Sequence, residues 1–207
     1  LDPGHRLSPG SAAAIAACVA HGARVVLATG RSFTSAAPYI RELALQPPHI
    51  TLNGAVLAEP AAGQFTVRAT LSPTQLDAVL ALLAERNIAH TIFGAAGIYA
   101  VPGTPHLEIL EDYGEPPAVL CAREELHSVP APMKVLSFLA PGPLDQELAA
   151  AVGDRVATIR SGERFFEFLP PEVSKGAALT ELMARYGITR DEVLAIGDGE
   201  NDLSMFA

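Results

Sequence analysis

The chain has 207 residues, of which 49% are hydrophobic, so it is long enough to bury a core as one large domain or two smaller ones. Its net charge of −9, without any cluster of Lys and Arg, argues against nucleic acid as a partner. No apolar run reaches the roughly 18 residues of a membrane span and no export signal is visible, so we expect a cytoplasmic protein, with monomer and homodimer equally compatible with the composition.

Residues 1–58, and again those from 172 onward, alternate helical patterns with short, continuous apolar runs. The predicted elements are a helix at 8–22 (SPGSAAAIAACVAHG), a strand at 23–30 (ARVVLATG), a helix at 32–45 (SFTSAAPYIRELAL), a strand at 49–54 (HITLNG), a helix at 174–187 (SKGAALTELMARYG) and a strand at 192–198 (EVLAIGD). Such strands are typical of a parallel sheet covered on both faces. We therefore expect an α/β fold with a Rossmann-like, doubly wound core. Cys18 and Cys121 are far apart in apolar surroundings, which predicts buried free thiols.

The middle of the chain has a different, α+β pattern. It predicts a turn at 60–64 (PAAGQ), a strand at 65–71, a helix at 72–87, two strands within 88–101, a strand at 134–140, a helix at 144–152, and a hairpin at 155–170 that turns at Ser161 and Gly162. We therefore predict a discontinuous core domain at 1–58 and 172–207, with an α+β cap domain at 59–171 inserted into it. Leu1 is not an initiator Met and the sequence stops inside a helical pattern, so we expect the core to be truncated at both ends.

Each apolar run of the predicted core ends in a polar side chain: Thr29, Asn53 and Asp198. Thr29 and Asn53 precede glycines, so each by itself could simply begin a turn. Ligands of parallel α/β sheets bind beyond the carboxyl ends of the strands, however, so the three side chains together predict one site. Asp198 is followed by Glu200, Asn201 and Asp202. Two carboxylates about 5 Å apart repel by roughly 3 kcal/mol at an effective dielectric of about 20, so a cation is expected among them.

The cation and its local alternatives can be narrowed from the sequence. A calcium loop is excluded because Leu203 occupies the position that needs Gly. Glu200 fits an ordinary first-turn acidic residue of a helix. Mg²⁺, which is held by one or two carboxylates together with waters and a phosphate, remains the expected metal. Lys175 follows the predicted N-cap Ser174, where the helix dipole disfavours positive charge, so it is either a solvated surface residue or part of the site.

The segments VVLATGR, TLNGA, VSKGAAL and IGDGENDLSM occur in this order, with a long insert before the third. This series resembles the haloacid dehalogenase superfamily of phosphatases, and specifically its Cof-like branch, whose cap lies between the second and third motifs. The resemblance implies that Thr29 and the N–H of Gly30 bind the transferring phosphoryl group and that Lys175 neutralises its oxygens. It implies that Asp198 is a Mg²⁺ ligand, and that Asp202 supports the metal's water shell or orients Lys175. Near the phosphate it places the remaining matched residues, Asn201, Arg31 and Asn53.

One family motif has no counterpart in the sequence. The resemblance calls for a strand that ends in two aspartates two residues apart, the first a nucleophile and the second a general acid and base. Asp2 cannot replace either, because no strand precedes it, so we expect the motif upstream of Leu1.

The expected activity is Mg²⁺-dependent hydrolysis of a small phosphomonoester, such as a sugar phosphate, through an aspartyl-phosphate. A phosphosugar mutase is one alternative, although no basic cluster suggests a second phosphate pocket in the cap. A catalytically inactive phospholigand-binding module is the other. Arg160 and Glu163, beside the predicted hairpin turn, are candidates for substrate selection.

Overall fold

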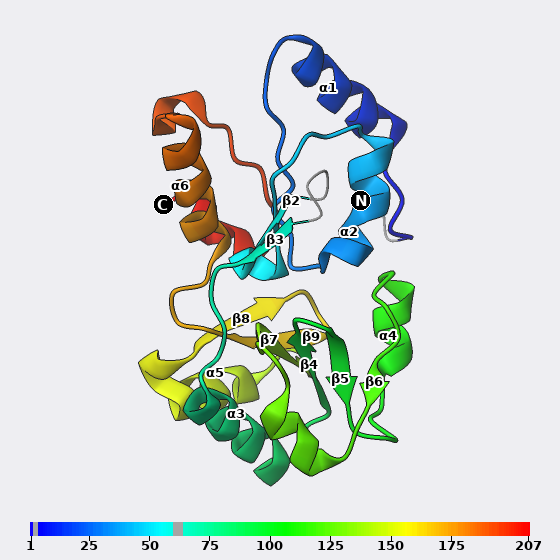
Figure 1. The fold of residues 1–207 in the computed structure, drawn as a ribbon, viewed down its shortest axis with the longest axis vertical. Helices are drawn as coiled ribbons and strands as arrows, with labels where there is room; N and C mark the ends of the chain where they lie inside the picture. The colour runs from blue at the N-terminus through cyan, green and yellow to red at the C-terminus, as the bar shows by residue number, and fades with distance from the viewer. Residues whose placement is uncertain (2–3, 60–63) are drawn as a thin grey trace.

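The computed structural model describes Leu1 and residues 4–59 and 64–207, which form two parts, one above the other in Figure 1. The upper part holds α1 (Pro9–Ala20), α2 (Phe33–Glu42), β1 (His49–Thr51), η1 (Leu52–Gly54), β2 (Val56–Glu59), β3 (Gln64–Val67), α6 (Lys175–Tyr186), η5 (Arg190–Glu192) and η6 (Glu200–Met205). Asp2 and most of the predicted turn at 60–64 lie outside the described residues.

The upper part is layered as the predicted doubly wound core requires. Residues 25–28 run parallel to β1, joined at Ala28 and Ile50. Their side chains alternate between two apolar clusters. Val25 and Leu27 pack with the buried residues of α2, whereas Val26 and Ala28 pack with those of β1, β2 and α6. Helices therefore cover both faces of this layer, and the predicted α/β class is confirmed.

The predicted strand at 192–198 is wrong. These residues have no strand assignment and no ladder partner among the described residues, and Leu194 and Ile196 are 84% and 82% exposed. An apolar run becomes a strand only when a neighbouring segment supplies hydrogen bonds, and no described segment does so here.

The predicted burial of both cysteines is also wrong. Cys18 is exposed, because α1 buries none of its residues, and Cys121 is only partly covered. An apolar composition makes burial possible, but burial requires a packing partner.

The lower part is built on one six-stranded sheet, in the order β6-β5-β4-β7-β9-β8. Its elements are α3 (Pro73–Glu85), β4 (His90–Gly94), β5 (Gly97–Ala100), α4 (Leu107–Asp112), β6 (Val119–Leu120), η3 (Arg123–Ser128), β7 (Lys134–Phe138), α5 (Pro143–Val152), η4 (Gly153–Arg155), β8 (Ala157–Ser161) and β9 (Phe165–Leu169). All neighbouring strands are antiparallel except β5 and β6. Figure 1 shows α3 and α5 on the side of the sheet away from the upper part.

The two faces of this sheet bury different clusters. Ile92, Val135, Phe166 and Phe168 pack toward the cluster that includes α3 and α5. The opposite face contributes Leu136, Phe165 and Leu169 to a cluster that also contains Leu52, Ala55 and Val56 of the upper part. We call the lower part the cap and the upper part the core, and the two therefore share a hydrophobic interface.

Two chain segments, residues 68–72 and 170–174, cross between cap and core. β3 lies within the predicted cap range of 59–171 yet pairs with β2 of the core. The domain limits at 58 and 172 stay a prediction. Among the described residues, no helix has the length and apolar character needed to cross a bilayer.

Candidate functional site

The polar residues at the ends of the predicted strands are joined by a continuous series of hydrogen bonds. The backbone N–H of Asn53 donates to the carbonyl of Thr29 at 3.0 Å, and the Asn53 side-chain oxygen accepts from Nδ2 of Asn201 at 3.0 Å. The next residue, Asp202, accepts from Nζ of Lys175 at 2.7 Å. Residues separated by more than 170 positions in the sequence therefore meet at one place on the core.

Close backbone approach explains how these segments come together. Gly54 has φ +100°, and a Cβ there would lie 2.2 Å from the carbonyl oxygen of Ser174, so glycine allows the loop after Asn53 to contact the N-terminus of α6. The side chain of Ser174 caps this helix by accepting from the N–H of Ala177 at 3.0 Å. Lys175, the first residue of α6, is thereby held beside the Asn53 loop.

Lys175 and Asp202 form a buried ion pair, with 5% exposure for each residue. Burial raises the pKa of the Asp202 carboxyl, but the hydrogen bonds from Lys175 and from the backbone N–H groups of Gly199 and Asp198 outweigh it. The net pKa of Asp202 is lower than its ordinary value. Both of its oxygens are thus engaged, one by Lys175 and the other by two N–H groups at 3.1 Å. This arrangement orients Lys175.

Asp198 differs from Asp202, because it is exposed and its carboxylate has no partner among the described residues. A free carboxylate is the hard oxygen donor that Mg²⁺ accepts, and this divalent ion needs only one or two such ligands when phosphate and waters complete its shell. No group of three or more His, Cys, Asp or Glu side chains within the described part of the chain forms a ready metal cage. The donor set therefore fits Mg²⁺ held mainly by Asp198, and it does not fit a metal enclosed by protein ligands.

Arg31 lies at the edge of this group. Its guanidinium donates to the hydroxyl of Ser35 at 2.9 Å and to the carbonyl of Tyr113 in the cap, and it stacks over the Tyr113 ring at 4.9 Å. The Arg31 side chain thus joins α2 to the end of α4. Its N–H donates to Oγ1 of Thr29 at 3.1 Å, so its backbone stays within the site.

Of the two candidate selection residues, Arg160 is held within the cap by Asp145 and by the carbonyl of Leu139. The other, Glu163, is exposed on the β8–β9 turn.

Two charged residues of the site have no motif that would reveal them. Lys134 on β7 and Glu167 on β9 are each 2% exposed and form an ion pair at 3.0 Å. Lys134 donates to the carbonyl of Gly30 at 3.0 Å, and Glu167 accepts from Nδ2 of Asn53 at 2.9 Å. The signal in the sequence is a single charge inside an otherwise apolar strand, MKVLSF and FFEFL.

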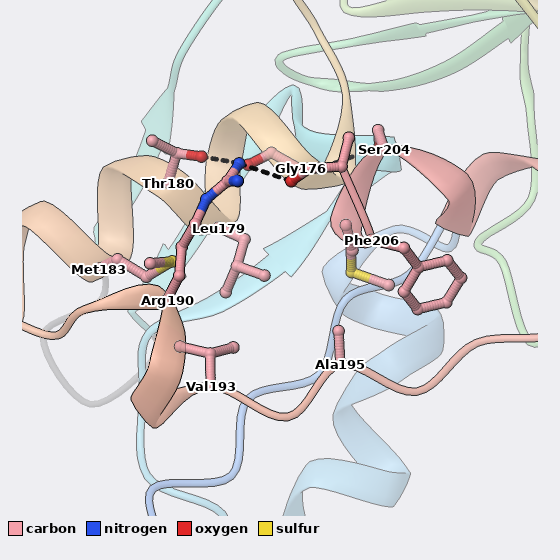
Figure 2. A pocket seen from close by; sticks show the side chains of 11 residues that line it. Gly176, Leu179, Thr180, Met183, Arg190, Val193, Ala195, Ser204 and Phe206 are labelled. Carbon is pink, nitrogen blue, oxygen red and sulfur yellow. Dashed lines mark hydrogen bonds between the residues drawn. The ribbon is translucent and has the colours of Figure 1, made fainter.

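The cavities lie beside this group and not within it. One of about 340 Å³ lies between α6 and the C-terminal segment; Figure 2 shows it bordered by Leu179, Met183, Val193 and Phe206, with the N–H of Gly176 bonded to Ser204. Another, of about 450 Å³, lies between core and cap and is lined by residues such as Ser32, Leu52, Phe93 and Met133. Thr29, Lys175 and Asp198 line neither cavity.

A family model for haloacid dehalogenase-like hydrolases matches residues 1–207. The chain belongs to this family. The HMP-PP phosphatase of Cronobacter sakazakii is 27% identical to this hydrolase over 209 residues, which cover 100% of this chain and 76% of that protein. A haloacid dehalogenase-like hydrolase from Bacteroides thetaiotaomicron has a similar structure, with a TM-score of 0.78, 24% identity, and coverage of 97% of this chain and 78% of that one.

A subclass IIB sugar phosphatase of the same superfamily also shares the fold of this hydrolase. It superposes with a TM-score of 0.82 at 19% identity, covering 97% of this chain and 77% of the other. The resemblance to the Cof-like phosphatases is thus confirmed, as is the expected enzyme class, a hydrolase of phosphomonoesters.

Proposed function

We propose that this hydrolase is a Mg²⁺-dependent phosphatase of small phosphorylated metabolites, sugar phosphates or compounds of similar size. The observation that carries the proposal is the hydrogen-bonded series from Thr29 through Asn53 and Asn201 to Asp202 and Lys175. Phosphoryl transfer depends mainly on positioning and on neutralising negative charge. A buried Lys with an oriented ammonium group, beside aligned N–H donors and a free carboxylate, supplies both.

In this proposal each residue has a role at a stated atom. Thr29 and the N–H of Gly30 bind the phosphoryl oxygens, Nζ of Lys175 neutralises them, and Nδ2 of Asn201 and the Asn53 loop hold that arrangement. Asp202 orients Lys175. Asp198 would hold Mg²⁺, with Asp202 behind it, and the ion would neutralise charge on the phosphate.

The nucleophile is proposed to be an aspartate that precedes Leu1 in the full-length protein, since none of the 207 residues shows the paired-aspartate motif. Attack of its carboxylate on phosphorus releases the alcohol and forms an aspartyl-phosphate. Water then hydrolyses this intermediate to inorganic phosphate. Reading the sequence upstream of Leu1 tests this step directly, because two aspartates two residues apart must be found at the end of a strand.

Phosphate release by the full-length protein tests the activity. The substrates are p-nitrophenyl phosphate, a set of phosphosugars and HMP-PP, each with and without Mg²⁺. We expect Mg²⁺-dependent release that falls by about a hundredfold or more in Asp198→Ala. Glu200→Ala, which removes a nearby exposed carboxylate, is the matched control and should retain activity. Full activity of Asp198→Ala would remove the metal assignment.

The same experiment separates the two alternatives. A phosphosugar mutase would convert one phosphosugar into another without net phosphate release. An inactive binding module would bind phosphosugars, detectable by calorimetry, without turning over any of them.

A further inference from the structure

Lys134 and Glu167 are an expensive pair to bury, and their own strands do not explain them. Both lie on the cap face toward the core: Glu167 is opposite Leu136 in the β7–β9 ladder, and Lys134 is two residues from Leu136. Their surroundings are apolar, with the Phe93 ring 4.4 Å from Nζ of Lys134. A well-packed apolar pair of similar size is often equally or more stabilising than a buried ion pair. Stability alone is therefore a weak reason for these charges.

The contacts of the pair point across the domain interface. Each charge makes one hydrogen bond to the core, and both bonds reach segments proposed to bind phosphate, at the carbonyl of Gly30 and at Nδ2 of Asn53. A single oxygen of Glu167, Oε2, accepts from both Lys134 and Asn53. The cap thus contacts the two proposed phosphate-binding loops through one ion pair.

These bonds determine how the loop atoms point. An ionised Glu167 can only accept, so the Asn53 amide must present its NH₂ to the cap, and its oxygen then faces Nδ2 of Asn201. Lys134 likewise holds the Gly30 carbonyl toward the cap, which directs the N–H of the same peptide, that of Arg31, to Oγ1 of Thr29. Neither bond could form if the cap moved away about residues 68–72 and 170–174.

We propose that Lys134 and Glu167 are positioning residues of the cap, which set the orientation of Asn53 and of the Gly30 peptide and so complete the phosphate site only when the cap is seated on the core. The inference rests on the proposed phosphatase function for its catalytic consequence, but the orientation of the loops can be measured without it.

The test uses the full-length protein with Lys134→Met/Glu167→Leu, which keeps the volume and removes both charges. We expect an unchanged or higher melting temperature, a kcat about tenfold to a hundredfold lower, and a KM that changes less. Lys134→Met/Glu167→Gln, which retains an acceptor for Asn53, should recover part of the lost kcat. The matched control is Arg86→Met/Glu147→Leu, an exposed pair on the cap that should leave kcat unchanged.

Hydrogen–deuterium exchange supplies the readout that does not need activity. Peptides covering residues 29–32 and 52–55 should take up deuterium faster in Lys134→Met/Glu167→Leu than in the unmodified protein. If the unmodified protein proves inactive but this change is seen, the proposed function fails and the positioning role stands. Unchanged uptake together with unchanged kcat overturns the positioning role. So does loss of the folded state in both Met-containing double variants, because the pair would then be required for folding itself.

Discussion

His49, which begins β1, is predicted to make this protein sensitive to mild acid. The residue is 0% exposed, and its Nδ1 accepts from the N–H of Leu27 at 3.4 Å. Its Nε2 is buried and has no partner among the described residues. Burial lowers the pKa of His49 from 6.5 to about 4. A protonated ring would turn an N–H toward the N–H of Leu27, and it would do so in the strand that leads to Asn53.

The sign and size of the effect follow from that pKa. Below pH 6.5 the unfolded chain binds a proton that the folded chain resists, so stability is complete near pH 8 and falls as the pH decreases toward 4. The free energy of unfolding should fall by about 2 kcal/mol between pH 8 and pH 5, and by about 3 kcal/mol once the pH is well below 4.

Urea unfolding followed by circular dichroism at pH 8 and pH 5 measures this loss, with His49→Asn as the comparison because the Asn oxygen can replace Nδ1 as acceptor. Burial also lowers the pKa of His90, but this residue is present in both proteins and cancels in the difference. We expect the unmodified protein to lose about 2 kcal/mol more than His49→Asn over this range. Equal losses in the two proteins would refute the reasoning.

Three further predictions concern the site. Gly54→Ala combines a strained φ of +100° with a contact of 2.2 Å, so it should cost about 2 kcal/mol or more, whereas Gly10→Ala, which meets nothing within 4 Å, should be neutral or stabilising; equal melting temperatures would contradict this. Lys175→Met leaves the buried Asp202 carboxylate without its cation and should cost about 3 kcal/mol in urea unfolding as well as nearly all turnover; retained turnover would count against its proposed role. The lowered pKa of Asp202 stabilises the fold above its ordinary value of 3.8, and that stabilisation is lost as the pH falls through the lower, folded value. Asp202→Asn should therefore show a smaller loss of stability than the unmodified protein in acid titrations below about pH 4, and parallel curves would show that Asp202 contributes nothing there.

Local patterns were sufficient where neighbouring residues decide the structure. Ser8, Ser72 and Ser174 cap the helices that the sequence predicts at those positions, and Gly187 ends α6 with a left-handed φ of 64°. The order of polar strand ends likewise placed Thr29, Asn53 and Asn201 in one hydrogen-bonded group. Each of these outcomes depends on bonds within a few residues or on the rule that parallel strands end at one edge.

The sequence by itself thus determined the α/β class, the helix ends and the candidate phosphate residues. Only the tertiary structure decided that residues 192–198 remain unpaired, that Cys18 is exposed, and that Lys134 and Glu167 reach the site from the cap. The physical reason is distance along the chain. A cap or a turn is made by residues three or four apart, whereas the partners of Glu167 and Lys134 in the core lie 114 and 104 positions away, and nothing in a local pattern specifies them.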